Sequence, residues 1–463
     1  MSENIIEKID RFVEDNMPGV LRDIAELVSI DSVARSSGPE GMPFGEGCAA
    51  ALEKGLEISE RLGLQAENCE GYIGYAQVGE GGRDCKNYLA TVTHLDVVPC
   101  GDEWTHDPFA MLEKEGYIIG RGVMDDKGPS VLCLYALKYL KENCPQLHYP
   151  VRALLGTCEE TDMADVIYYL NNYPAPLFCF SPDADFPMCN GEKGIFRGNL
   201  ISYCRPENVV QIKGGLVANA VPDKAEALVK AENLVSTQSV TAEKEGEFWH
   251  LTAKGIGGHA SLPEGTVNAI GALLKYILDN GIASEEEKKY FEACMLIHED
   301  YTGAAAGIAA SDNIFKPLTA VSGLIGIEDG HFFQSLDCRY PTTTSGENIC
   351  RLLEEKVGDV LHAEIYHDNP PFYMSLDKPE VQACLEAYNE VTGENAEPYT
   401  IGGGTYARDF PNAVSFGPEH PERPQPEWAG PIHGVDEAAS IEFFREALKI
   451  YILALLKLEE LDF

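Results

Sequence analysis

The chain has 463 residues, of which 35 are Lys or Arg and 75 are Asp or Glu, so its formal net charge is −40 at pH 7. At about 150 residues per domain, this length predicts two or three domains. The large negative charge disfavours binding to nucleic acid or to anionic membranes, because their phosphate groups would repel the protein. An apolar fraction of 44% and a charged fraction of 24% are ordinary for a soluble globular protein.

Signals for secretion or membrane insertion are missing from the sequence. The N-terminal residues are acidic and amphipathic, without a cationic region followed by an apolar one. The apolar run at 450–456 is much shorter than the roughly 20 residues that span a bilayer. The 14 cysteines are scattered, with no Cys-x-x-Cys pair, which favours a reducing compartment. We therefore expect a cytoplasmic protein that does not associate with membranes.

Apolar spacing predicts several helices along the chain. Helical spacing appears over residues 4–13 and again over 21–28, where we expect a second helix. Another helix is expected over 128–144, and two more close the chain at 378–392 and 441–456.

Three β-prone runs each end at a polar motif. Residues 88–93 lead into His94-Leu95-Asp96, residues 151–155 into Gly-Thr-Cys-Glu159-Glu160, and residues 177–180 into Ser-Pro-Asp183. Strands that alternate with helices predict the α/β class, with a mixed, mostly parallel sheet and helices on both faces. Ligands of such sheets bind at the carboxyl ends of the strands, which is where these polar residues are expected.

The middle of the chain has a different texture. Between residues 196 and 375, short β-like runs mix with helices near 267–280 and 347–358, which predicts an inserted α+β lid domain. The last part of the chain should rejoin the first. The predicted organisation is a catalytic domain formed by residues 1–195 and 376–463, with the lid domain at 196–375 between its two parts.

Each polar motif has an ordinary explanation when taken alone. His94 could be a hydrogen-bonded histidine at the edge of the core, and Asp125-Asp126, in a glycine-rich turn, could cap a helix. Glu159-Glu160 could be a surface pair, and Asp183 a turn residue. A single assumption, that these four motifs form one shared metal site, explains all of them. Imidazole combined with carboxylates suits Zn²⁺, Mn²⁺ or Co²⁺ better than Ca²⁺ or an iron–sulfur cluster.

Together the motifs resemble a known family. In family order they are Thr-His94-Leu-Asp96, Gly-Arg-Gly-x-x-Asp125-Asp-Lys-Gly-Pro, Gly-Thr-Cys-Glu159-Glu160 and Ser-Pro-Asp183-Ala-Asp. They are similar to those of the co-catalytic zinc peptidases, which include aminoacylase, glutamate carboxypeptidase, succinyl-diaminopimelate desuccinylase and carnosinase. The nearest likeness is to bacterial dipeptidases of the PepV and Sapep type, and it covers essentially the whole chain.

The resemblance implies a di-metal site. One metal ion would be bound by His94 and Asp183 and the other by Glu160 and His433, and Asp125 would bridge the two. The family pattern also implies a cis peptide bond between Asp125 and the next residue. The metals are expected to be Zn²⁺, with Mn²⁺ or Co²⁺ as alternatives.

The resemblance also implies the catalytic and substrate-binding residues. Glu159 would be the general base, Asp96 the acidic neighbour that supports His94, and His259 a lid residue that reaches the scissile carbonyl. The implied substrate-binding positions are Asn219, Arg339, Gly403 and Gly404. From the residues alone, His259 could equally be structural and Arg339 a surface cation.

The expected activity is hydrolysis of unblocked dipeptides, with Arg339 binding the substrate carboxylate and the lid closing during catalysis. The alternatives are a deacylase or carboxypeptidase of the same architecture, acting on N-acyl amino acids, and a non-catalytic binding relative. The large insertion favours the dipeptidase and is compatible with a monomer, while a homodimer stays open. Cys158 stands where relatives commonly carry Asp, which suggests the hypothesis that activity is sensitive to oxidation.

Overall fold

The computed structural model describes residues 5–35 and 37–463, and these form two compact units. Unit 1 contains the chain up to Asn190 together with Tyr373–Tyr399 and Gly404–Phe463. Unit 2 contains Gly191–Phe372 and Thr400–Gly403. It therefore includes residues 191–195 and 400–403, which we expected in the catalytic domain, whereas residues 373–375 of the expected lid domain belong to unit 1.

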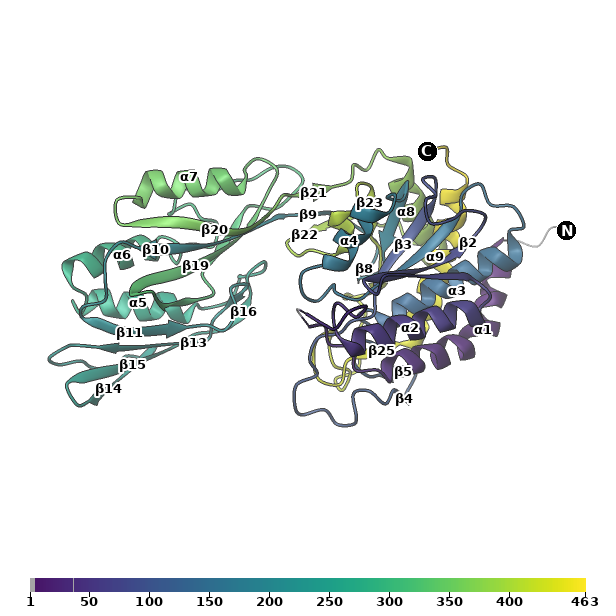
Figure 1. Ribbon diagram of the computed structural model, residues 1–463. Helices are drawn as coiled ribbons and strands as arrows, with labels where there is room; N and C mark the ends of the chain where they lie inside the picture. Colours follow the sequence, from purple (N-terminus) through teal and green to yellow (C-terminus); the bar gives the residue numbers. More distant parts are fainter. Residues whose placement is uncertain (1–4, 36) are drawn as a thin grey trace. The chain divides into compact units, whose positions relative to one another are not determined.

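Unit 1 is built from helices and a central sheet (Figure 1). Its helical elements are α1 (Ile5–Val28), α2 (Glu46–Arg61), α3 (Lys127–Asn143), α4 (Ala164–Asn172), α8 (Pro379–Thr392), the short 3-10 helix η1 (Tyr406–Asp409) and α9 (Ile441–Glu459). Its strands are β1 (Gln65–Cys69), β2 (Ile73–Val78), β3 (Leu89–His94), β4 (Leu112–Lys114), β5 (Tyr117–Ile119), β6 (Val151–Gly156), β7 (Phe178–Ser181), β8 (Ala184–Asp185), β23 (Ala413–Ser415), β24 (Pro418–Glu419) and β25 (Ala438–Ser440). Three of the four boundaries between the units fall within β9 (Cys189–Glu192), β21 (Phe372–Tyr373) and β22 (Tyr399–Ile401), and the fourth lies between Gly403 and Gly404.

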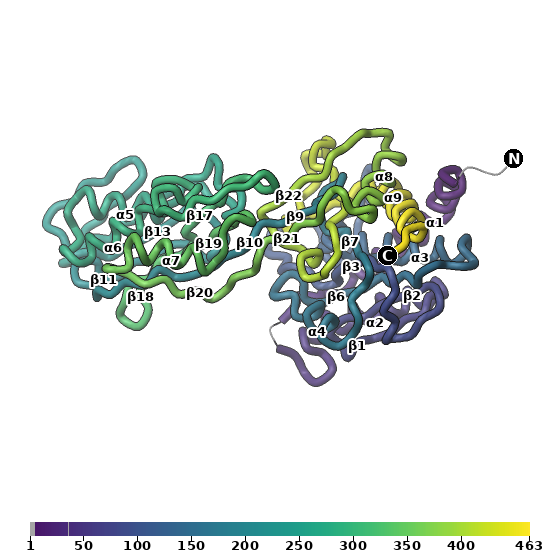
Figure 2. The backbone as a smooth tube through the Cα atoms, turned by 90° about the horizontal axis from the view of Figure 1, so that it is seen from above, coloured from purple at the N-terminus to yellow at the C-terminus, as the bar shows by residue number. Residues whose placement is uncertain are grey.

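The main sheet of unit 1 is mixed, with parallel strands at its centre. Its order is β1-β2-β6-β3-β7-β23-β9-β21, and β6, β3, β7 and β23 run parallel to one another. Strands β6, β3 and β7 lie next to one another in Figure 2. His94, the last residue of β3, is level with Gly156, the last residue of β6. The carboxyl ends of β3, β6 and β7 therefore lie at one edge of the sheet, as the sequence predicted.

Helices cover both faces of this sheet. On one face, Leu155 of β6 lies against Gly55 of α2, and α3 packs against β3. Successive side chains of a strand point to opposite faces. Gly156 accordingly lies on the other face, against η1 and α4. The predicted α/β class with two covered faces is confirmed.

One helical prediction is wrong. The two helices expected over 4–13 and 21–28 are a single helix, α1, with Pro18 inside it; residue 4 lies outside the described part of the chain. Its buried residues follow each other at helical spacing through the whole length: Ile9, Phe12, Val13, Met17, Val20, Ile24, Leu27 and Val28. The loss of one backbone hydrogen bond at the proline is offset by this continuous apolar stripe.

Unit 2 is an α+β structure around a second sheet. Its strand order is β14-β15-β13-β11-β18-β19-β10-β20, with β17 beside β19. These strands are β10 (Gly194–Ser202), β11 (Val209–Gly214), β13 (Lys224–Val229), β14 (Val240–Glu245), β15 (Phe248–Lys254), β17 (Thr319–Val321), β18 (Ile325–Glu328), β19 (His331–Tyr340) and β20 (Leu361–Asn369). The other elements are β12 (Ala220–Val221), β16 (Gly258–His259), α5 (Ala269–Asp279), α6 (Glu285–Met295) and α7 (Gly346–Val357). One apolar core joins the sheet to these helices. Across both units, the described helices include none with the length and apolar character needed to span a membrane.

Gly156 should be intolerant of any side chain, because a Cβ there would lie 2.3 Å from the Tyr406 hydroxyl and 2.7 Å from Asp165 Oδ2. We expect Gly156→Ala to cost about 1–3 kcal/mol of stability through overpacking. A thermal unfolding scan should show a lower midpoint. Gly82→Ala is the control, since a Cβ at Gly82 meets no atom within 4 Å. Equal midpoints for the two variants would contradict this packing.

Candidate metal centre

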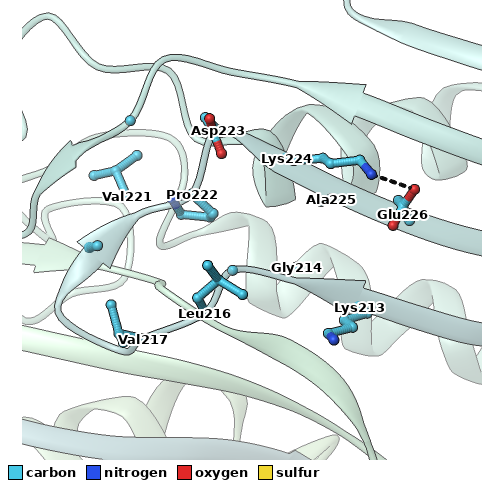
Figure 3. Close-up of a pocket in the computed structure, with 13 residues that line it drawn as sticks. Lys213, Gly214, Leu216, Val217, Val221, Pro222, Asp223, Lys224, Ala225 and Glu226 are labelled. Carbon is cyan, nitrogen blue, oxygen red and sulfur yellow. Dashed lines mark ion pairs between the residues drawn. The ribbon is translucent and has the colours of Figure 1, made fainter. Parts of the chain in front are cut away.

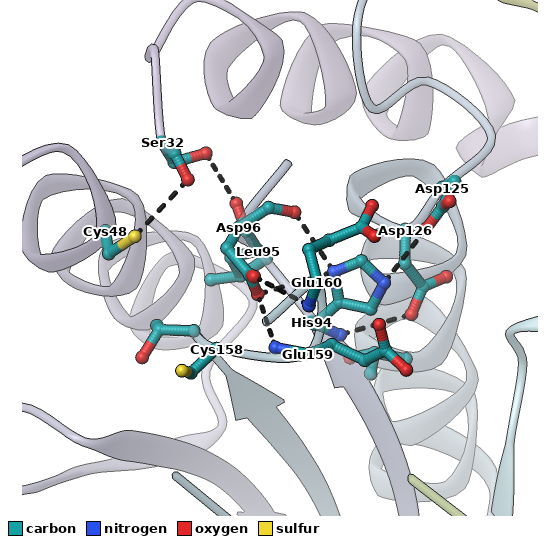
Figure 4. Close-up of polar contacts among 12 residues, drawn as sticks. Ser32, Cys48, His94, Leu95, Asp96, Asp125, Asp126, Cys158, Glu159 and Glu160 are labelled. Carbon is teal, nitrogen blue, oxygen red and sulfur yellow. Dashed lines mark hydrogen bonds and ion pairs between the residues drawn. The ribbon is translucent and has the colours of Figure 1, made fainter. Parts of the chain in front are cut away.

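The polar residues that follow three strands of unit 1 meet at the carboxyl edge of its sheet. His94 ends β3, Glu159 and Glu160 follow β6, and Asp183 follows β7. Asp125 comes from the turn that precedes α3, and His433 from the segment that precedes β25. Figure 4 shows His94 with Asp125, Glu159 and Glu160 around it. All five predicted metal ligands and the predicted base therefore lie in one compact unit.

The His94 ring is fixed by a backbone carbonyl. Its Nδ1 lies 3.0 Å from the carbonyl oxygen of Asp96, so Nδ1 carries a proton and donates it. Nε2 lies 2.9 Å from Asp125 Oδ1 and 4.0 Å from Asp183 Oδ2. Nε2 is buried and has no partner of hydrogen-bond geometry among the described residues. An imidazole nitrogen placed in this way can offer its lone pair to a metal ion.

Asp125 lies between the two histidines. His433 Nε2 lies 2.8 Å from Asp125 Oδ2 and 2.9 Å from Glu160 Oε1. Asp125 and then Glu160 raise the pKa of His433 to about 10. Burial alone would raise the pKa of Asp125, but its close contacts with His433 and His94 lower it below its usual range. The peptide bond between Asp125 and Asp126 is cis, as the family pattern implied.

The remaining carboxylates repel one another. Burial, and then the charge of Asp183, raises the pKa of Glu159 well above its ordinary value. Burial and then Asp125 do the same to the pKa of Asp183. The possible ligand atoms form two groups, and within each group they all lie within 4.8 Å of one another. One group is His94 with Glu159 and Asp183, and the other is His94 with Asp125 and Glu160. The first group includes Glu159, which the sequence predicts to be the base.

The donor set fits divalent metal ions. Four carboxylates face only two imidazoles, so the cluster has more negative charge than its own side chains compensate. Zn²⁺, Mn²⁺ and Co²⁺ accept imidazole nitrogen and carboxylate oxygen as ligands. The unpartnered Nε2 of His94 lies among these carboxylates. A metal-dependent site is therefore the chemistry that these residues support.

Asp96 holds two parts of the centre at once. Its carbonyl oxygen accepts a hydrogen bond from His94 Nδ1. Its carboxylate oxygens accept hydrogen bonds from the backbone N–H groups of Glu159 and Glu160, each at 3.1 Å. The carboxylate itself lies 3.5 Å from His94 Nδ1. Asp96 thus fixes the Glu159–Glu160 turn as well as the histidine.

Sequence reasoning missed Glu437 and Arg121, which connect the Asp125 turn to the His433 segment. Glu437 is 1% exposed and accepts the backbone N–H groups of Met124 and Asp125 at 3.0 and 3.2 Å. Its other oxygen accepts Arg121 Nη1 at 2.6 Å, and Arg121 Nη2 donates to the carbonyl oxygen of His433 at 3.3 Å. These contacts join segments more than 300 positions apart in the sequence, so no local pattern reveals this pair.

Asp165 and Tyr406 were also missed. Asp165 accepts the backbone N–H groups of Thr157 and Cys158 at 2.6 and 3.0 Å and the hydroxyl hydrogen of Tyr406. The Tyr406 ring contacts the His94 ring edge to face. These contacts fix the segment that leads to Glu159, and nothing in the local sequence points to them.

The predicted lid residues Asn219, His259, Arg339 and Gly403 all belong to unit 2, whereas Gly404 belongs to unit 1. Pairing of β12 with β16 places Ala220 opposite His259, and the carbonyl oxygen of Asn219 accepts the N–H of Ala260 at 2.9 Å. Arg339 is not a surface cation, because it is only 3% exposed.

The His259 ring has a defined tautomer. Its Nδ1 accepts the backbone N–H of Ser261 at 3.2 Å and lies 2.7 Å from the Ser261 hydroxyl. Burial, and then Arg339, lowers the pKa of His259. The ring is therefore neutral at pH 7, with its proton on Nε2 available for donation.

A separate cavity of about 480 Å³ lies in unit 2 (Figure 3). Its apolar lining includes Leu216, Val217, Val221 and Pro222, and an ion pair between Lys224 and Glu226 lies at one side. None of the predicted site residues lines this cavity.

Comparison with known proteins identifies the family. A model of Peptidase family M20/M25/M40 matches residues 90–457, so the chain belongs to this family and is a metallopeptidase, as the resemblance implied. A putative dipeptidase, YtjP, from Bacillus subtilis is 33% identical over 95% of this chain and 97% of its own length. A Beta-Ala-Xaa dipeptidase from Lactobacillus delbrueckii subsp. lactis is 31% identical over 96% and 97%.

Solved structures show the same fold at low sequence identity. Human carnosine dipeptidase 1 is 12% identical and matches 99% of this chain and 100% of its own, with a TM-score of 0.57. Aminoacylhistidine dipeptidase from Vibrio alginolyticus is 13% identical, with coverages of 95% and 96% and a TM-score of 0.58.

Replacing Glu437 should weaken metal binding, because its carboxylate holds the Asp125 turn and the Arg121 side chain. We expect Glu437→Gln to lower metal affinity by about 10–100-fold, the usual effect of losing a residue that orients ligands. Isothermal titration of the metal-free protein with Zn²⁺ measures this. The control is Glu427→Gln, which alters an exposed residue of the neighbouring segment. Equal affinities for both variants would show that Glu437 does not orient the ligands.

Cys158 should react slowly with thiol reagents, contrary to the hypothesis of an oxidation-sensitive residue. Its side chain is 2% exposed, and burial raises its pKa far above the ordinary value, so little thiolate forms. Peptide mapping after brief iodoacetamide treatment should find the partly exposed Cys85 modified before Cys158. Preferential modification of Cys158 in the folded protein would restore the oxidation hypothesis.

Proposed function

We propose that the protein is a di-metal dipeptidase that hydrolyses the peptide bond of unblocked dipeptides, with Glu159 as general base. The observation that carries this proposal is the position of Asp125, whose two oxygens face His94 and His433 at 2.9 and 2.8 Å. A carboxylate with one imidazole at each oxygen is suited to bridge two cations. The names of the relatives, a putative dipeptidase and a Beta-Ala-Xaa dipeptidase, support dipeptides as the substrate class.

The proposed ligand assignment follows the sequence prediction. His94 and Asp183 would hold one ion, Glu160 and His433 the other, and Asp125 both. Zn²⁺ is the first choice for this nitrogen and oxygen donor set, with Mn²⁺ and Co²⁺ as alternatives. When bound, such a pair of ions supplies Lewis-acid activation of water and of the scissile carbonyl.

Glu159 is suited to move the proton. It lies at the carboxyl edge of the sheet, and its backbone is fixed by Asp96. Its carboxylate lies within 4.8 Å of ligand atoms of His94 and Asp183, so a water molecule held at that metal position would be within its reach. Glu159 would take the proton of the attacking water and deliver it to the leaving amine.

Residues of unit 2, together with Gly404 of unit 1, would bind the substrate. Neutral His259 can donate its Nε2 hydrogen to the carbonyl oxygen as negative charge develops there. Arg339 would face the C-terminal carboxylate, and Asn219, Gly403 and Gly404 would contribute further polar contacts.

All 14 cysteines are free thiols, which supports a reducing compartment such as the cytoplasm. No nucleic acid or membrane partner is proposed, and both a monomer and a homodimer are compatible with the proposal.

Glu159→Gln should abolish turnover without removing the metals. The change keeps the shape of the side chain but removes the basic oxygen, so we expect kcat to fall by about 10²–10⁴-fold. Hydrolysis of free dipeptides should be measured with Zn²⁺, Mn²⁺ and Co²⁺, alongside tripeptides and N-acetyl amino acids. Metal content by elemental analysis should stay at the wild-type level.

Asp162→Asn is the matched control, because it removes an exposed acid from the same turn and should retain activity. Full activity in Glu159→Gln would refute the role of the base. Faster hydrolysis of N-acetyl amino acids than of any dipeptide by the wild-type protein would refute the proposed substrate class.

A further inference from the structure

Two arginines share one buried aspartate on the sheet of unit 2. β10 and β19 pair antiparallel with Arg197 directly opposite Asp337. Arg339 follows Asp337 by two positions on β19, so the three side chains project from the same face of the sheet. His259 lies close enough for its pKa to respond to all three charges. The sequence prediction included Arg339 but neither Arg197 nor Asp337.

Asp337 cancels the charge of Arg339. Its side chain is 0% exposed, and it accepts Arg339 Nε at 2.7 Å and Nη2 at 3.2 Å. Arg339 Nη1 donates to the carbonyl oxygen of Gly402 at 2.8 Å. Three of the five N–H groups of Arg339 are therefore already used. An incoming carboxylate would meet a buried pair with no net charge, and the nearby Asp337 would repel it.

Arg197 restores a positive charge to this cluster. Its Nε donates to Asp337 Oδ2 at 3.0 Å, and its side chain is 30% exposed. Its two Nη groups make no hydrogen bond within the part of the chain that the structure describes. Because His259 is neutral, the cluster of Arg197, Asp337 and Arg339 has a net charge of +1. Arg197 is the more exposed of the two arginines, so this positive charge is accessible mainly at Arg197.

We propose that Arg197 is a specificity-determining residue, which attracts the C-terminal carboxylate of the dipeptide while Arg339 is held in place by Asp337. This inference rests on the proposed function. Charge-assisted hydrogen bonds from the free Nη groups give the carboxylate a strong partner that the neutralised Arg339 does not provide by itself. Dipeptides with a free carboxylate are thereby preferred over peptides whose carboxylate is blocked.

A purely structural role for Arg197 makes a different prediction. If the residue only compensates the charge of Asp337, its removal lowers the thermal stability of the protein but affects all substrates equally. A role in specificity instead changes KM for substrates that carry the carboxylate and leaves kcat unchanged.

The test compares a dipeptide with its own C-terminal amide. For Arg197→Gln, we expect KM for the free dipeptide to rise about tenfold, the effect of losing a hydrogen bond to a charged group. The KM for the amide and both kcat values should stay at wild-type levels. Arg197→Lys should recover most of the loss, because it keeps the charge. Arg351→Gln, which removes an exposed arginine from α7 of the same unit, should match the wild type.

The outcomes separate the two proposals. If the wild-type protein hydrolyses dipeptides and Arg197→Gln leaves KM for the free dipeptide unchanged, the inference is overturned and the proposed function stands. An equal rise in KM for the dipeptide and its amide also overturns it, because the effect then does not depend on the carboxylate. If the wild-type protein hydrolyses no dipeptide, the proposed function fails and the inference fails with it.

Discussion

Asp125 joins two distant parts of the chain, since one of its carboxylate oxygens faces His94 and the other faces His433. The rest of the centre depends on this shared position. Glu437 holds the backbone of Asp125, while Arg121 binds Glu437 with one nitrogen and the carbonyl oxygen of His433 with another. The turn before α3 and the segment before β25 are thereby fixed to each other, and the ligands are held before any metal arrives.

This arrangement is electrostatically expensive. Burial and mutual repulsion raise the pKa values of Glu159 and Asp183, and two histidines cannot neutralise the four carboxylates around them. Such a cluster destabilises a fold unless cations compensate it. Divalent metal ions relieve this repulsion, and they use the same carboxylates as ligands. The same four carboxylates therefore destabilise the metal-free fold and give it the capacity to bind metal ions.

The sequence predicted those parts of the site that follow from local patterns. Three β-prone runs end at His94, at the Glu159–Glu160 pair and at Asp183, and parallel strands bring such ends together. His433 follows no strand and was identified only through the family resemblance.

The undetected residues act through contacts between segments that are far apart in the sequence. Glu437 binds the Asp125 turn, Asp165 binds Tyr406 and Arg197 binds Asp337, so no local spacing reveals them. The single helix α1 was divided in the prediction, because two separate apolar patterns were read where the buried residues Met17 and Val20 in fact connect them. Local pattern thus predicts the elements and the residues at their ends, whereas hydrogen bonds between segments determine how those residues are held.

Anomalous scattering from crystals of the zinc-loaded protein tests the central claim most directly. The account predicts two zinc peaks with Asp125 bound to both, one peak ligated by His94 and Asp183 and the other by Glu160 and His433, with Glu159 bound to neither. A single peak, or two peaks that Asp125 does not bridge, would contradict the account. Direct ligation by Glu159 would likewise contradict its assignment as the base.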